Sequence, residues 1–144
     1  MKIMAVDLGD ARTGLAVCDR TEFLASPIGT VEERRFDVLV QKVAYMAKQY
    51  EVEEIVVGLP LNMNGSKGPR AEKAELFANA LNEATEITVN MWDERSTTVQ
   101  AHNYLNVTNT RGKKRKEIVD TVSATIILEA YLDFRRKRKE KEQA

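Results

Sequence analysis

The 144-residue chain contains one cysteine, one histidine and three prolines, and only 6% of its residues are aromatic. The single cysteine, Cys18, cannot form an intrachain disulfide, and it is too little for a Cys/His metal cluster. No apolar run reaches the length of a membrane span, and the first residues lack the pattern of a signal peptide. We therefore expect a single-domain cytoplasmic protein that does not associate with a membrane.

The net charge is zero, yet the charges are unevenly distributed along the chain. Residues 1–110 contain 11 Lys and Arg against 16 Asp and Glu, whereas residues 111–144 contain 11 against 6. A basic segment on an otherwise acidic protein indicates a polyanionic partner such as nucleic acid. The alternative is a solvated helix end whose lysines complement the helix dipole.

Hydrophobic periodicity predicts five strands and four helices. The strands are expected over residues 2–8, 13–18, 24–32, 54–58 and 87–92, and the helices over 36–50, 70–84, 96–105 and 117–134. Three strands joined by hairpins precede strands that alternate with helices, which is typical of an α/β fold with a mixed five-stranded sheet and helices on both faces. Pro27 indicates a bulge or an edge position in the third strand. We expect one domain over 1–134 and a charged, fraying tail over 135–144.

Carboxylates follow the strands that would meet at one edge of this sheet. Asp7 ends the first strand, Asp93 and Glu94 end the fifth, and Asp120 begins the last helix. Each acid alone also fits a turn or a helix cap, but clustered carboxylates repel one another unless cations neutralise them. Oxygen-only ligands favour Mg²⁺ or Mn²⁺, and a pair of such ions can promote phosphodiester cleavage. Neighbouring strand residues face opposite sides, so strand parity alone leaves Asp93 and Glu94 as alternatives.

Basic side chains near the predicted loops are candidates for contacts with substrate phosphates. These candidates are Arg12, Lys67, Arg70, Arg95, Lys113, Lys114, Arg115 and Lys116. Gly65 and Gly68 lie among them and would allow close approach of the backbone to a phosphate.

Four blocks in order resemble the signatures of the YqgF family of pre-16S ribosomal RNA nuclease and Holliday junction resolvase-like proteins. They are Val6–Gly14 (VDLGDARTG), Val57–Gly65 (VGLPLNMNG), Asp93–Thr98 (DERSTT) and Val119–Asp120 (VD). The resemblance implies a ribonuclease-H-like fold. It also implies that Asp7, Glu94 and Asp120 are the catalytic acids and the metal ligands. One departure from many ribonuclease-H-like nucleases is Gly58, which stands where the fourth strand often ends in an acid.

The resemblance therefore predicts a metal-dependent nuclease that matures the 5′ end of pre-16S ribosomal RNA. The alternatives are cleavage of branched DNA, as by a Holliday junction resolvase, and a non-catalytic nucleic-acid-binding factor. The first hairpin also resembles the phosphate hairpin of actin-like ATPases, but those enzymes need two such domains. We expect nucleic acid as the partner and a monomer or weak homodimer as the oligomeric state.

Overall fold

The structure is a computed structural model that describes residues 1–94 and 112–143, with side chains in the second segment from Val122 to Glu142. The expected helix over 96–105, and Arg95 with it, lies outside the described residues. In the described part of the chain, no helix is both long enough and apolar enough to cross a membrane.

Five strands form one mixed sheet in the spatial order β3-β2-β1-β4-β5. Their bounds are β1 (Ile3–Asp7), β2 (Arg12–Cys18), β3 (Ala25–Glu32), β4 (Glu54–Leu59) and β5 (Thr88–Asp93). The first three strands pair antiparallel, whereas β1, β4 and β5 run parallel. Both expectations for Pro27 are confirmed, because β3 is an edge strand and its register with β2 shifts between Leu15 and Ala16, opposite Pro27. The predicted mixed α/β sheet is therefore confirmed.

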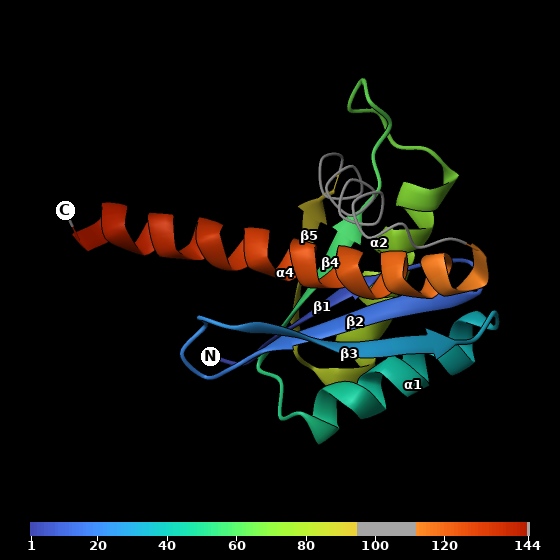
Figure 1. Cartoon of the computed structure of the whole chain (residues 1–144), viewed down its shortest axis with the longest axis horizontal. Coiled ribbons are helices and arrows are strands. Elements are labelled where there is room, and N and C mark those ends of the chain that lie inside the picture. The colour runs from blue at the N-terminus through green and yellow to red at the C-terminus, as the bar shows by residue number, and fades with distance from the viewer. Residues whose placement is uncertain (95–111, 144) are drawn as a thin grey trace.

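Helices cover both faces of this sheet (Figure 1). The helices α1 (Phe36–Gln49) and α2 (Pro69–Thr85) pack on one face, and α4 (Gly112–Gln143) crosses the other. Alternation along β1 divides the core: Met4 and Val6 are buried under α1 and α2, and Ile3 and Ala5 are buried under α4. The face covered by α4 is called the α4 face below.

The last helix is longer than the sequence predicts. We expected it to begin at residue 117 and to end at Phe134, but α4 runs from Gly112 to Gln143, so both predicted ends are wrong. Beyond Phe134 the helix is held to the sheet by Arg135, whose Nε lies 2.7 Å from Glu22 Oε1. Such a long-range ion pair leaves no periodic hydrophobic signal in the sequence.

Candidate active site

Asp7 and Glu94 lie on the same face of the sheet, at the carboxyl ends of their strands. Asp7 follows Ile3 and Ala5 in the alternation of β1, so it faces the α4 side and is half-buried there. In β5 the even-numbered residues share that face: Asn90 Nδ2 donates to Tyr131 Oη at 3.0 Å, and Tyr131 belongs to α4. Glu94 continues this even-numbered series one residue after the strand ends, and only 8% of its surface is exposed.

Gly58 provides the space in which the Glu94 carboxylate lies. A Cβ atom at this position would overlap Glu94 Oε2 and would come within 2.9 Å of Ile127 Cδ1 on α4. The backbone N–H of Glu94 also donates to the Leu59 carbonyl at 3.3 Å, which ties the end of β5 to the end of β4. Glu94 is therefore held over the last residues of β4, between the sheet and α4.

The parallel register brings this carboxylate next to Asp7. Val6 pairs with Val57, so the following pair in the register is Asp7 and Gly58. Neighbouring strands are about 4.8 Å apart, which makes Asp7 and the glycine under Glu94 adjacent positions. The absence of an acid at the end of β4 is thereby explained, because β5 delivers a carboxylate over a glycine at that place.

The surroundings of Glu94 alter its ionisation. Burial raises the pKa of Glu94, the nearby Arg70 guanidinium opposes this rise, and the charge of Asp93 adds to it. Asp93 itself is exposed. Arg70 lies in the first turn of α2, so the structure brings one predicted phosphate contact into the electrostatic field of a predicted catalytic acid.

A polar turn leads from β4 into α2 and so positions Arg70. The Asn62 backbone N–H donates to the Ser66 carbonyl at 2.9 Å, and Asn62 Nδ2 donates to Ser66 Oγ at 3.0 Å. Ser66 Oγ in turn donates to Asn64 Oδ1 at 2.6 Å, and Gly65 supplies the left-handed backbone, with φ of 86°, that the turn needs. These bonds define the loop although most of its residues are exposed.

The other predicted site residues are two cations paired with carboxylates, one acid on α4, and the basic run that begins α4. Arg12 Nε lies 3.7 Å from Glu32 Oε1, and Lys67 Nζ lies 2.8 Å from Glu75 Oε1, so both cations are engaged by carboxylates. Asp120 belongs to α4, the helix that covers the face of Asp7 and Glu94, but its side chain is outside the described residues. The run of Lys113, Lys114, Arg115 and Lys116 begins the same helix, and its side chains are likewise not described.

Three of the predicted site residues are therefore related by the described geometry: Asp7, Glu94 and Arg70. Among the described side chains, no three His, Cys, Asp or Glu residues cluster closely enough to hold a metal ion. The sequence reasoning missed the role of Gly58, which it treated only as a missing acid. The signal was present, because a glycine at the end of a buried strand often marks a close approach.

Comparison with known proteins identifies the family. The family model RuvX, described as Holliday junction resolvase, matches residues 1–134. A protein of Caldanaerobacter subterraneus subsp. tengcongensis named "Putative pre-16S rRNA nuclease" is 44% identical over 135 residues, which cover 92% of this chain and 96% of that protein. A protein of the same name from Heliobacterium modesticaldum is 40% identical over 144 residues, which cover 100% of this chain and 97% of that protein.

Solved structures share the fold at much lower identity. RuvC of Thermus thermophilus in complex with a Holliday junction substrate has a TM-score of 0.59 and 14% identity, and the match covers 94% of this chain and 96% of RuvC. The fowlpox virus Holliday junction resolvase has a TM-score of 0.58 and 13% identity, with 92% and 99% covered. These likenesses confirm the predicted ribonuclease-H-like fold. With the family match over residues 1–134, they show that the chain belongs to the RuvX (YqgF) family of Holliday junction resolvases, which are phosphodiester-cleaving nucleases.

Proposed function

We propose that this nuclease cleaves precursor ribosomal RNA, in the maturation of the 5′ end of 16S RNA, and that Asp7, Glu94 and Asp120 are its catalytic acids. The observation that carries the proposal is the position of the Glu94 carboxylate over Gly58, one strand away from Asp7 and on the same face. Asp120 joins them in the proposal because α4 covers this face.

The donor chemistry of this place fits a divalent cation. Asp7 and Glu94 offer only oxygen atoms, and the glycine at position 58 leaves room for a carboxylate over the strand. Oxygen donors suit Mg²⁺ or Mn²⁺ better than zinc, so we assign Asp7, Glu94 and Asp120 as the residues that would hold such an ion. When bound, the ion would activate water and stabilise the departing oxygen of the phosphodiester.

The residues of the chain itself supply positioning and charge. Burial makes the Glu94 carboxylate a stronger base than an exposed glutamate, which suits it to orient and deprotonate the attacking water. We assign to Arg70, which lies in the first turn of α2 and whose charge acts on this carboxylate, the role of holding the scissile phosphate. We assign the weaker role of contacting flanking phosphates to Arg12, Lys67, Arg95 and the run Lys113–Lys116.

We propose RNA as the substrate because the relatives of higher sequence identity are named for it. Proteins 38–44% identical to the chain are named for pre-16S rRNA, whereas the structural relatives with Holliday junctions are about 14% identical. The description of the family as Holliday junction resolvases supports branched DNA as the second candidate. We further propose that the domain of residues 1–134 acts in the cytoplasm, as a monomer or weak homodimer.

A cleavage assay tests this proposal. Purified protein is incubated with labelled precursor 16S RNA and with a synthetic four-way DNA junction, each with Mn²⁺ and with EDTA. We expect Mn²⁺-dependent cleavage of the RNA, which Asp7→Asn abolishes, because removing one charged ligand weakens an oxygen site for the metal. Cleavage of the junction alone would move the assignment to the resolvase, and cleavage of neither would leave a binding factor.

A further inference from the structure

A second exposed surface lies at the other end of the strands from Asp7 and Glu94, beside the amino ends of β1 and β4. Residues 19–24 connect β2 to β3 there, since β2 runs antiparallel to β1, and the last turns of α4 pass beside this loop. Two large apolar side chains of this loop are exposed, Phe23 at 75% and Leu24 at 60%. Neighbouring exposed apolar side chains are a common mark of a binding surface.

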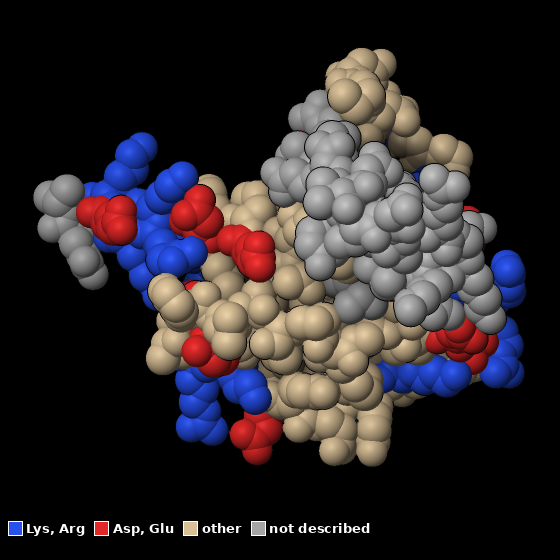
Figure 2. Space-filling view, in the orientation of Figure 1, with Lys and Arg blue, Asp and Glu red and all other residues tan. Residues whose placement is uncertain are grey.

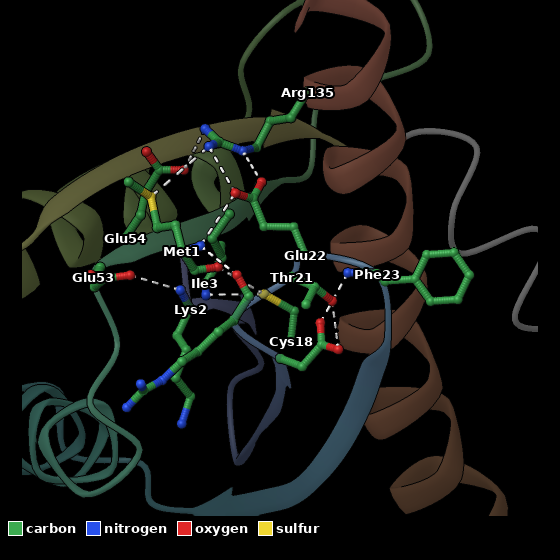
Figure 3. A network of polar contacts seen from close by, with 12 residues as sticks. Met1, Lys2, Ile3, Cys18, Thr21, Glu22, Phe23, Glu53, Glu54 and Arg135 are labelled. Atoms are coloured by element: carbon green, nitrogen blue, oxygen red, sulfur yellow. Dashed lines mark hydrogen bonds and ion pairs between the residues drawn. The ribbon is translucent and has the colours of Figure 1, made fainter.

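The loop holds Phe23 in a defined position. Asp19 Oδ1 accepts the backbone N–H groups of Phe23 at 2.9 Å and of Leu24 at 3.3 Å. Glu22 adopts a left-handed backbone, with φ of 61°, and its buried carboxylate pairs with Arg135 of α4. Figure 3 shows this network, with the Phe23 ring turned away from it. The loop is therefore fixed at its polar residues while it displays an aromatic ring, so little ordering is needed on binding.

Positive charge surrounds this ring. The guanidinium carbon of Arg136 lies 6.0 Å from the centre of the Phe23 ring, at the limit of a cation–π contact. Residues 135–142 of α4 contain six Lys and Arg against two Glu. Figure 2 shows these blue side chains gathered at the protruding end of the molecule.

We propose that Phe23 and Arg136, together with the basic end of α4, form a binding site for a single strand of nucleic acid, apart from Asp7 and Glu94. Single-strand sites combine a basic surface with aromatic side chains on which bases stack, and residues 135–142 and Phe23 supply these two elements here. The occupant is a strand rather than an acidic protein segment, because an exposed ring beside a cation offers a base a stacking surface, and the basic end of α4 offers counter-charges to its phosphates. This extends the proposed function, since the strand belongs to the same substrate.

The length of α4 sets the expected spacing between the two sites. Sixteen residues separate Asp120 from Arg136, which is about 24 Å along a helix that rises 1.5 Å per residue. A stacked strand advances about 3.4 Å per nucleotide, so about seven nucleotides span that distance. The second site should therefore serve substrates that continue at least about seven nucleotides from the cut.

Equilibrium binding of labelled oligouridine in EDTA tests the site without requiring cleavage. For a 15-nucleotide strand, we expect Phe23→Ala to weaken binding about fivefold or more and Phe23→Trp to retain it, because stacking needs a ring. For a five-nucleotide strand, Phe23→Ala should weaken binding by a smaller factor, because so short a strand does not span the distance between the two sites. Tyr45→Ala is the matched control, since Tyr45 is 61% exposed on α1 across the sheet, and it should change neither affinity.

The salt dependence gives a second readout. Arg136→Gln should reduce the slope of log affinity against log salt by about 0.7, whereas Lys48→Gln on α1 should leave the slope unchanged. Equal RNA affinity in wild type, Phe23→Ala and Arg136→Gln, with unchanged melting temperatures, would overturn the site and leave a protein partner as its occupant. Weakened binding by these variants in a protein that cleaves no substrate would support the site and refute the proposed nuclease reaction.

Discussion

Burial of the Glu94 carboxyl affects both the stability of the fold and the proposed catalytic role of this residue. Its pKa is raised because burial disfavours the charged form. The native state therefore favours the protonated form, so the contribution to stability is greatest at low pH and is lost as pH rises through the raised pKa. Above this raised pKa, the buried ionised carboxylate lowers the free energy of unfolding.

The first prediction is that Glu94→Gln abolishes cleavage and raises the melting temperature at pH 8 in EDTA. The neutral amide keeps the shape and removes the buried charge, so the gain should shrink as pH is lowered and wild-type Glu94 becomes protonated. Thermal unfolding at several pH values, together with cleavage rates, measures both effects.

Asp93→Asn is the matched control for this variant. Asp93 is exposed, so its replacement should change the free energy of unfolding by less than about 1 kcal/mol, with cleavage retained. A loss of cleavage confined to Asp93→Asn would reverse the assignment of the second acid.

The second prediction concerns Gly58. In Gly58→Ala the new methyl group would overlap the Glu94 carboxylate and crowd Ile127, which we expect to cost about 1–3 kcal/mol of stability and most of the activity. Urea denaturation and a cleavage assay measure these losses. In Gly68→Ala, by contrast, the new Cβ meets Asn62 no closer than 3.5 Å, so its stability should change by less than about 1 kcal/mol. Full activity in Gly58→Ala would show that Glu94 can act from another position.

At the scale of elements, α4 spans the sheet from the carboxyl ends of the parallel strands to their amino ends. Ala124, Ile127 and Leu128 pack on the α4 face, and Arg135 reaches Glu22 and Glu54 at the amino edge of the parallel strands. Burial opposes the ionisation of Glu22, but the hydrogen bond and charge of Arg135, together with the charges of Lys139 and the N-terminus, lower the pKa of Glu22 overall. The pair thus helps to hold the last turns of the helix against the rest of the fold.

The third prediction is that Arg135→Gln destabilises the fold by about 2 kcal/mol, because it leaves the buried Glu22 carboxylate with a weaker partner. The matched control is Arg138→Gln, which removes an exposed pair with Glu142 at 3.5 Å and should cost less than about 0.5 kcal/mol. Chemical denaturation compares the two variants, and equal losses would contradict an anchoring role for Arg135.

For the molecule as a whole, the zero net charge means that attraction to nucleic acid depends on local segments rather than on overall charge. Residues 111–144 carry a balance of +5 against −5 in the remainder, and all of this basic segment that the structure describes belongs to α4. One helix therefore carries the basic run at its start and the basic end beyond Phe134.

The fourth prediction is that replacing Lys113, Lys114, Arg115 and Lys116 with Gln weakens RNA binding and flattens its salt dependence. Each lost phosphate contact should reduce the slope of log affinity against log salt by about 0.7 on a single strand. Binding titrations at several salt concentrations measure the slope. An unchanged slope would return this run to its alternative interpretation as a solvated helix start.

The sequence alone determined the strands, their mixed sheet and the helices that cover it. These features follow from local periodicity: β1 alternates, α1 repeats at helical spacing, and each signal lies within a few residues of the element it predicts. The family blocks likewise named Asp7, Glu94 and Asp120 before any geometry was known, although the role of each as a catalytic acid stays a prediction.

Only the tertiary structure decided which of Asp93 and Glu94 lies over β4, and why position 58 is a glycine. Strand parity separates the two acids into opposite faces, but the face that α4 covers depends on packing between residues more than 30 positions apart, such as Asn90 and Tyr131. The contact that holds α4 beyond Phe134 depends in the same way on Arg135 meeting Glu22 across the fold. Contacts of this kind are absent from the local pattern, because the chain must fold before their partners become neighbours.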